Sequence, residues 1–174
     1  MKKRIIKSSS NYEIIRDIAS GGMGYVCKAR LRGVEGFEKI VAIKTLLSRY
    51  ARDDEFVKRF VFEAKLVANL VHENIVQIYH LDRTGSEYLI VLEFVDGISL
   101  YDCVELHKVI DRRLPRNLAV FIASRAARAL AYAHSRCDVD GKPLNIIHCD
   151  ICPHNILINK EGVPKITDFG IAKA

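Results

Sequence analysis

The chain has 174 residues, of which 49% are hydrophobic and 28% are charged. This balance is typical of a globular protein with a core and argues against a disordered or fibrous chain. The 27 Lys and Arg residues exceed the 21 acids and give a net charge of +6, which suits an anionic partner such as a nucleotide or an acidic protein. Because the basic residues are scattered among acids, we expect no nucleic-acid partner.

The sequence predicts neither a secretion signal nor a membrane-spanning segment. The N-terminal stretch MKKRIIKSSSNY lacks the apolar run of a secretion signal, and the longest apolar run, YLIVLEFV, is too short to span a bilayer. We therefore expect no membrane segment in this chain and a cytoplasmic location. The cysteines form an odd and irregular set, which predicts free thiols: Cys27, Cys103, Cys137, Cys149 and Cys152.

The first half of the chain has strand character with one helix. Runs rich in β-branched and aromatic residues, separated by glycine-bearing turns, predict strands at residues 12–18, 25–30, 38–46, 75–81 and 88–94. Residues 53–71 have helical spacing, with one apolar stripe formed by Phe56, Phe60, Ala64, Val67 and Val71. An antiparallel sheet of five strands with one helix follows from this order.

The second half is mainly helical. We expect a short helix at residues 99–108 and a longer one at residues 116–135, which follows Pro115 and places Leu118, Ile122, Ala126, Leu130 and Ala133 on one face. Two short strands are predicted at residues 156–159 and 164–167. The fold class is therefore α+β, with a basic tail at 1–11, a five-stranded lobe at 12–95 and a helical lobe at 96–174.

Two features of the first lobe suit phosphate binding. Gly21, Gly22 and Gly24 lie between the first two strands, where backbone N–H groups can approach phosphate oxygens, although such a turn can also be a plain hairpin. The segment VAIK places Lys44 inside an apolar strand, where a buried ammonium needs an anionic partner. Glu63, beside the apolar stripe of the following helix, is the candidate partner.

The segment HCDICPHNIL, residues 148–157, allows two interpretations. Two cysteines in CxxC spacing with His148 and His154 are consistent with a zinc site. His148, Asp150 and Asn155 have instead the spacing of a phosphoryl-transfer loop. No second CxxC or HxxxH pair is present elsewhere in the sequence, so the second interpretation is favoured.

Five motifs in order, namely the glycine-rich turn, VAIK, a helix glutamate, HxDxxxxN and ITDFG, make the chain similar to the protein serine/threonine kinases. The GGMG loop is typical of the bacterial members, and the resemblance covers residues 12–174. It implies a protein-kinase-like fold, and Pro153 in DxxPxN matches the serine/threonine class.

The resemblance implies an enzyme that uses ATP and Mg²⁺ to phosphorylate a Ser or Thr hydroxyl of a protein substrate. Asp150 would accept the hydroxyl proton, and Lys44, paired with Glu63, would hold the α and β phosphates. Asn155 and Asp168 would bind Mg²⁺. The nucleotide would contact Gly21, Gly22, Gly24, Val26, Ala42, Lys44, Glu93, Val95 and Leu157. An apolar column between the lobes would consist of Val67, Ile78, His148 and Phe169.

The sequence departs from the kinase pattern at several positions. Ala19 replaces the first glycine of the loop, Cys149 stands where many relatives have Arg, and Cys152 stands where most have Lys. The last change removes a cation expected near the transferring phosphoryl group. The sequence also stops four residues after DFG, so we expect a fragment of a longer kinase.

Three functions remain open. The first is an active protein kinase domain, and the second is a weak or inactive kinase-like module that binds a nucleotide or a partner. The third is a small-molecule phosphotransferase of the aminoglycoside kinase type, which shares the HxDxxxxN logic but fits GGMG and DFG poorly. The presence of Lys44, Glu63, Asp150, Asn155 and Asp168 favours the first.

Overall fold

The structure is a computed structural model that describes residues 5–7, 11–20, 24–46, 53–85 and 87–169. The chain divides into two compact units. Unit 1 consists of residues 1–69 and 77–94, and unit 2 consists of residues 70–76 and 95–174.

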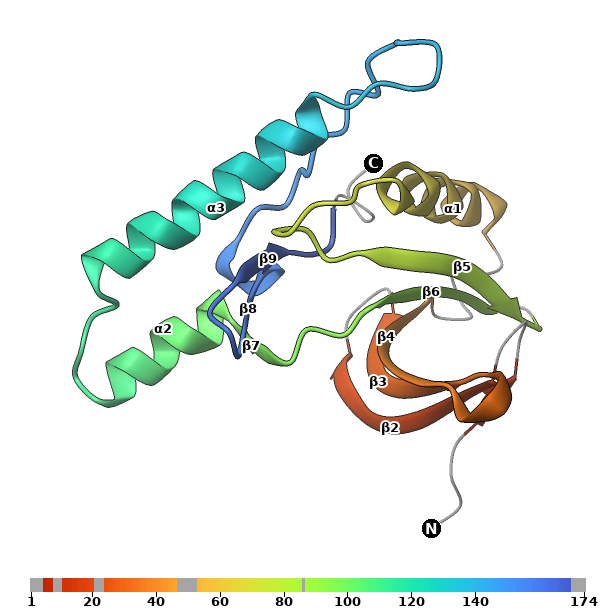
Figure 1. Cartoon of the computed structure of the whole chain (residues 1–174), viewed down its shortest axis with the longest axis horizontal. Coiled ribbons are helices and arrows are strands. Elements are labelled where there is room, and N and C mark those ends of the chain that lie inside the picture. The colour runs from red at the N-terminus through yellow and green to blue at the C-terminus, as the bar shows by residue number, and fades with distance from the viewer. Residues whose placement is uncertain (1–4, 8–10, 21–23, 47–52, 86, 170–174) are drawn as a thin grey trace. The chain divides into compact units, whose positions relative to one another are not determined.

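Unit 1 is built on an antiparallel sheet (Figure 1). Its strands are β1 (Ile5–Lys7), β2 (Asn11–Ser20), β3 (Gly24–Arg32), β4 (Glu38–Leu46), β5 (Ile78–Thr84) and β6 (Glu87–Glu93), and they lie in the order β1-β2-β3-β4-β6-β5. The five predicted strands are all present. A further short strand, β1, comes from the segment assigned to the basic tail and pairs with β2, with Ile6 opposite Tyr12.

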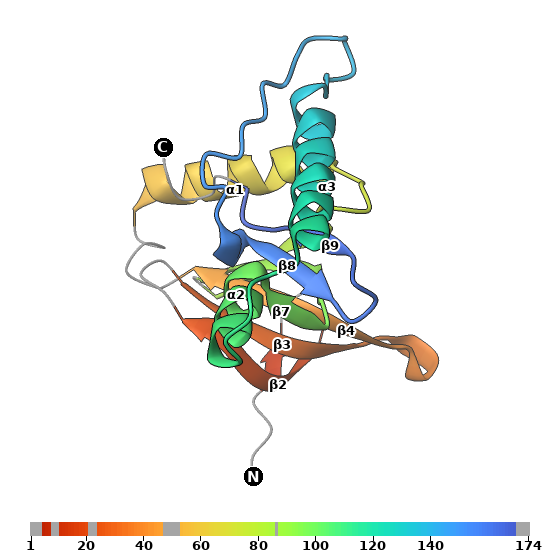
Figure 2. The same ribbon diagram turned by 90° about the vertical axis from the view of Figure 1, so that its left-hand side faces the viewer.

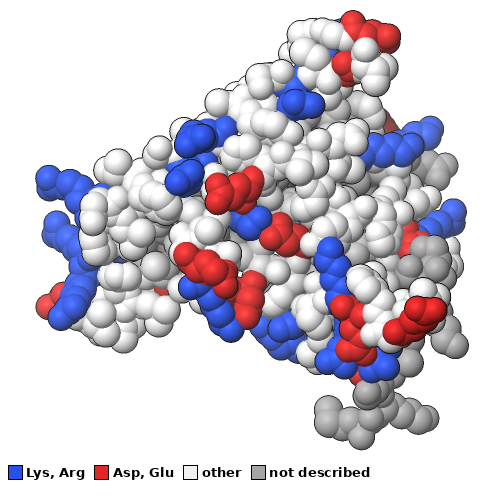
Figure 3. Space-filling view, viewed as in Figure 1, with Lys and Arg blue, Asp and Glu red and all other residues white. Residues whose placement is uncertain are grey.

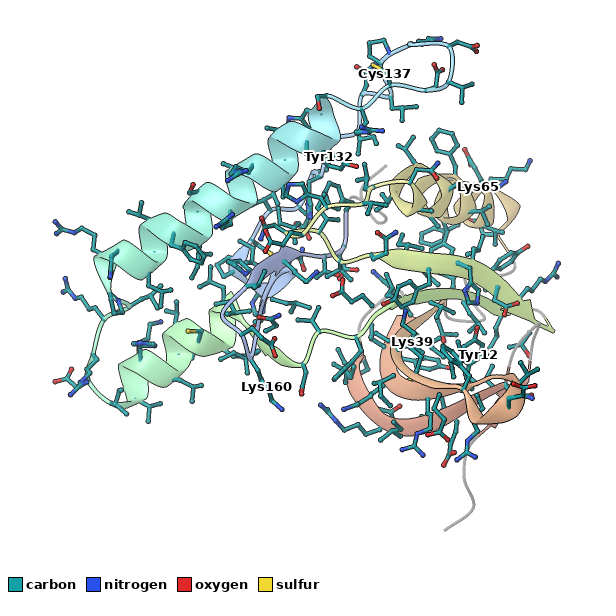
Figure 4. The ribbon with its side chains drawn as sticks, in the orientation of Figure 1. Tyr12, Lys39, Lys65, Tyr132, Cys137 and Lys160 are labelled. Carbon is teal, nitrogen blue, oxygen red and sulfur yellow. The ribbon has the colours of Figure 1, made fainter. Side chains whose placement is uncertain are left out.

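The core of unit 1 follows from the period of two along its strands, because alternate residues of a strand share one face. Cys27 of β3 lies opposite Ile43 of β4, which in turn lies opposite Val91 of β6, and all three are fully buried. Tyr12 is also fully buried and lies inside the curve of the sheet (Figure 4). Its hydroxyl group is 2.6 Å from Nε2 of His80, which satisfies the buried polar end of the ring.

Helix α1 (Asp54–Ala68) contacts β5 of the same unit. The side chain of Asp53 begins the helix by accepting hydrogen bonds from the backbone N–H groups of Glu55 and Phe56. The predicted stripe is confirmed for its central members, since Phe60, Ala64 and Val67 are buried. Val71 was wrongly assigned to this stripe, because the helix ends before it and its side chain is 72% exposed.

Unit 2 combines a three-stranded sheet with two helices. The sheet has the order β7-β8-β9, formed by β7 (Gly97–Ser99), β8 (Ile156–Asn159) and β9 (Pro164–Ile166). Helix α2 (Leu100–Val109) follows β7 directly, and helix α3 (Arg116–His134) packs beside β9, as both views show (Figures 1 and 2). A short 3₁₀ turn, η2 (Pro153–Asn155), precedes β8.

The buried face of α3 agrees with the predicted stripe at Ile122, Ala126 and Ala133. Residues 70–76 join unit 2 because they bond to β9. Ile166 accepts a hydrogen bond from the N–H of Val76 and donates one to the carbonyl of Asn74. In the part of the chain that the structure describes, no helix is both long and apolar enough to cross a bilayer.

The β7–β8 pair depends on a glycine. A Cβ atom at Gly97 would lie 1.8 Å from the carbonyl oxygen of Ile158 and 2.7 Å from Cα of Asn159. Both are backbone atoms, so relief requires the strands to separate.

We expect Gly97→Ala to lower the free energy of unfolding by about 2 kcal/mol or more, as overpacking does, in a urea titration followed by circular dichroism. Gly33→Ala is the matched control, because the atoms nearest to its Cβ would belong to the side chain of Phe37, the first at 3.0 Å. Equal stability of Gly97→Ala and the unmodified chain would contradict the close approach of β7 and β8.

Candidate active site

Unit 1 holds the predicted lysine in the middle of its sheet. Lys44 of β4 lies opposite Val26 of β3 on one side and Ile90 of β6 on the other, and its side chain is half-buried. Ala42, two residues earlier, is buried on the same face of β4 as Lys44. The register therefore places the candidate phosphate lysine and two candidate adenine contacts, Val26 and Ala42, on adjacent strands.

The glycine-rich turn is described only at its end. Gly21 and Gly22 lie outside the described residues, so their predicted contact with phosphate stays a prediction. Gly24 pairs with Leu46, and a Cβ atom there would lie 2.1 Å from the carbonyl oxygen of Thr45. The sheet itself therefore requires glycine at position 24, whatever the turn binds.

Glu63 lies in α1 between Phe60 and Val67, both of which are buried. Its side chain is outside what the structure describes, so the ion pair between Lys44 and Glu63 stays a prediction.

The end of β6 leads into the segment that the resemblance assigns to adenine. Glu93 lies opposite Val41 of β4, and its backbone N–H donates to the carbonyl of Gln77 at 2.8 Å. The carboxylate of Glu93 in turn accepts from the backbone N–H of Gln77 at 3.3 Å. These reciprocal bonds hold the end of β6 in place. Val95, the other predicted backbone contact, belongs to unit 2 and is half-buried.

In unit 2 the catalytic-loop candidate is anchored by a buried histidine. Nε2 of His148 is 2.9 Å from the carbonyl oxygen of Thr167, and Nδ1 accepts from the N–H of Asp150 at 3.2 Å. The two bonds together define a neutral ring with its proton on Nε2. The ring also packs on Phe169, with centroids 4.6 Å apart.

Asn155 connects Asp150 to the DFG segment. Its side-chain amide donates to the carbonyl of Asp150 at 2.9 Å and to the carboxylate of Asp150 at 3.0 Å. Its backbone carbonyl accepts from the N–H of Thr167 at 3.0 Å. Asp168 is the next residue, so the three predicted polar residues of this unit are brought together. Leu157 follows in β8, where it lies opposite Ser99 and Lys165.

Two backbone positions in this cluster are in the left-handed region. Cys149 has φ of 60° and Asp168 has φ of 58°. Such conformations cost on the order of 1–3 kcal/mol each in residues other than glycine and persist where the surroundings hold them. The hydrogen bonds that His148 and Asn155 make to neighbouring residues stabilise these two backbone conformations.

The residue types suit a magnesium ion. The amide nitrogen of Asn155 faces Asp150, which leaves its Oδ1 oxygen as a ligand atom, and the carboxylate of Asp168 supplies another oxygen. Magnesium is usually held by one or two such oxygens together with phosphate groups and water. Among the described residues, no three His, Cys, Asp or Glu side chains come close enough to hold a metal by themselves.

The zinc interpretation of this loop receives no support. His148 bonds to Thr167, whereas His154 stacks on Tyr101 of α2 with ring centroids 4.0 Å apart. The thiol of Cys149 is directed to the carbonyl of Ile147 at 3.7 Å. Three of the four candidate zinc ligands therefore face different partners.

Sequence reasoning missed two residues that build this site. The backbone of Thr167 connects His148 to Asn155. Asn74 is 2% exposed and donates from its side chain to the carbonyl of Pro164 at 2.8 Å, which fixes β9. An asparagine directly before the apolar pair Ile75 and Val76 was the available signal, because a buried amide needs partners.

Burial lowers the pKa of the His148 imidazole, although the bond to Thr167 and the nearby Asp150 and Asp168 oppose this shift. The folded state therefore takes up the proton less readily than the unfolded state. The stabilisation by neutral His148 is complete above the ordinary value of 6.5 and is lost as the pH falls below it.

We expect the free energy of unfolding, measured by urea titration, to fall as the pH is lowered from about 7 to about 5. His148→Phe should lower stability by about 1–3 kcal/mol at neutral pH, because two hydrogen bonds are lost, and should flatten this pH dependence. The control is His134→Phe at an exposed position at the end of α3. An unchanged slope in His148→Phe would disprove the assignment.

The chain is similar to known proteins over most of its length. Residues 12–174 match the family described as protein kinase domain. The chain is 37% identical over 163 residues to "Tyrosine-protein kinase MasK" of Myxococcus xanthus and 39% identical over 166 residues to "Serine/threonine-protein kinase PrkC" of Bacillus subtilis. The alignments cover 94% and 95% of this chain but only 25% and 23% of those proteins, so the chain spans about a quarter of their length.

Among solved structures, the chain is similar to the kinase domain of Mycobacterium tuberculosis PknI, with a TM-score of 0.74 and 28% identity. The match covers 93% of this chain and 59% of that one. The family match includes the strand lysine, the loop around Asp150 and Asn155, and the DFG aspartate, and it spans nearly the whole sequence. The chain therefore belongs to the protein kinase domain family.

Proposed function

We propose that the chain binds ATP with Mg²⁺ and transfers the γ-phosphoryl group to a hydroxyl group of a protein. The observation that supports this most directly is the pair of hydrogen bonds from the Asn155 side chain to Asp150, together with the bond from Thr167 to Asn155. These bonds orient the carboxylate that would act on the substrate and join the residue before Asp168 to the same loop.

In the proposed reaction, the carboxylate of Asp150 orients the acceptor hydroxyl group and takes its proton. The hydroxyl oxygen forms a bond to the γ-phosphorus atom, the bond to the β,γ-bridging oxygen breaks, and ADP leaves. Bound magnesium would neutralise charge on the phosphates. Asn155 and Asp168 would supply its protein ligands.

The remaining roles concern nucleotide binding. Lys44, paired with Glu63, would hold the α and β phosphates, and the backbone of the glycine-rich turn at Gly21, Gly22 and Gly24 would cover them. Adenine would lie against apolar side chains and meet the backbone of the segment after β6. Those contacts would come from Val26, Ala42, Glu93, Val95 and Leu157.

A serine or threonine acceptor is the first candidate. It is supported by Pro153 in the DxxPxN loop and by the name of the relative PrkC. Tyrosine is a second candidate, because the relative MasK is named a tyrosine-protein kinase. We also propose a cytoplasmic location, supported by the use of ATP and by five cysteines that are all free.

Nucleotide binding is tested with Lys44→Gln and Asp168→Asn. We expect each to weaken magnesium-dependent ATP binding, measured by isothermal titration calorimetry, by at least about tenfold, since a hydrogen bond to a charged group is worth about 1.5–3 kcal/mol. The matched control is Lys39→Gln, because Lys39, labelled in Figure 4, is on the same strand. Its ammonium group lies 3.7 Å from the centroid of the Tyr79 ring. If Lys44→Gln, Asp168→Asn and Lys39→Gln all bound ATP with the same affinity, the proposed nucleotide site would be refuted.

Phosphoryl transfer is tested with Asp150→Asn, which keeps the shape of the side chain but removes the base. We expect transfer from ATP to a protein acceptor to fall about 10²- to 10⁴-fold, while magnesium-dependent ATP binding is retained. Asp140→Asn, at an exposed position, is the control.

Phosphoamino acid analysis of the product distinguishes a serine or threonine acceptor from tyrosine. ATP binding without any transfer to protein would support instead the weak or inactive module, for which the loss of the usual lysine at Cys152 gives a physical reason. Transfer to a small-molecule acceptor would support the aminoglycoside kinase type.

A further inference from the structure

The corner between α2 and α3 exposes an apolar stripe. Leu106, Val109 and Ile110 are 58%, 82% and 61% exposed. Their spacing of three and four residues places them on one face at the end of α2. No residue of α2 is buried, so this face has no partner within the described part of unit 2.

Basic residues surround this stripe. The segment 108–116 contains four cations, Lys108, Arg112, Arg113 and Arg116, and a single acid. Lys108 is paired with Glu105 at 2.6 Å, which raises its pKa. The three arginines are exposed and form no ion pair with any residue that the structure describes. Blue side chains accordingly gather at the left edge of the space-filling view, over the connection between α2 and α3 (Figure 3).

The backbone of the corner is held in one conformation. Asp111 has φ of 52°, its N–H donates to the carbonyl of Lys108 at 3.0 Å, and the N–H of Arg112 donates to the carbonyl of His107 at 2.9 Å. This pair of bonds is the Schellman ending of a helix. Pro115 then begins α3 by accepting from the N–H of Ala119 at 3.0 Å. Little backbone conformational entropy would therefore be lost when the corner meets a partner.

We propose that the corner formed by residues 106–116 binds the surface of a membrane rich in anionic lipids. Apolar side chains flanked by Lys and Arg are the combination with which interfacial segments enter the headgroup region. The charge is complementary, and each basic residue near an anionic bilayer changes partitioning by about fivefold, equivalent to about 1 kcal/mol. A protein partner fits less well, because stable protein interfaces bury about 800 Å² per partner around pockets, whereas this surface is a single helix end and its connection.

A tryptophan reporter tests the proposal, because the chain contains no tryptophan. With Val109→Trp, we expect a blue shift of the fluorescence when vesicles of equal parts phosphatidylglycerol and phosphatidylcholine are added, and none with pure phosphatidylcholine. Val139→Trp is the matched control, since Val139 is fully exposed but lies in the turn after α3; it should not respond. The shift should diminish as salt is added.

Charge-reversal variants test the role of the arginines. Arg112→Glu with Arg113→Glu should weaken co-sedimentation with the anionic vesicles by at least about tenfold, following the value per residue. Arg128→Glu with Lys142→Glu makes the same change in net charge at exposed positions elsewhere and should have a much smaller effect.

Three results would overturn the proposal. The first is an unchanged fluorescence of Val109→Trp when anionic vesicles are added. The second is an equal loss of vesicle binding in both charge-reversal pairs, which would mean that the net charge of +6 alone attracts the chain to the vesicles. The third is a response of Val109→Trp to soluble polyglutamate but not to vesicles, which would assign the corner to an acidic polypeptide.

Discussion

The backbone of Thr167 makes the two hydrogen bonds on which the geometry of the candidate active site depends. Its carbonyl faces the ring of buried His148, and its N–H donates to the carbonyl of Asn155. Asn155 also donates hydrogen bonds to Asp150. These bonds together connect the loop at Asp150 to the segment that contains Asp168. β9, the strand that ends directly before Thr167, is also bound by hydrogen bonds to Asn74 and Val76. Positioning of polar groups in this way is what phosphoryl transfer requires of a protein, since the reaction needs little covalent help.

Those elements of the fold that carry their own hydrophobic pattern could be predicted from the sequence. The bounds of β4 and β8 agree with the expected residues 38–46 and 156–159, because both segments are rich in β-branched residues. β5 begins three residues later than expected, at Ile78, because Ile75 pairs instead with Ile166 of unit 2. β1 and β7 have three residues each, too few to show a period. They exist only because longer strands pair with them, which is tertiary information.

The candidate site could likewise be predicted from the sequence only in part. The order and spacing of the motifs led to the prediction of Asp150, Asn155 and Asp168, because their chemistry is tied to residue type. The contribution of Thr167 could not be predicted, since it comes entirely from the backbone. The stack of Tyr101 on His154 joins residues far apart in sequence, and neither residue carries a pattern that indicates the other.

Residues 70–76 belong to unit 2, although the residues before and after them belong to unit 1. This limits where the chain can be cut to isolate one unit. The chain passes between the two units after residues 69, 76 and 94, so unit 2 is discontinuous in sequence. A piece excised from residue 95 onward would lack Asn74 and Val76. The N–H of Ile166 and the carbonyl of Pro164 would then lose their partners beneath the DFG segment. Dissection at the apparent lobe boundary would therefore damage the strand next to the residues that we propose as magnesium ligands.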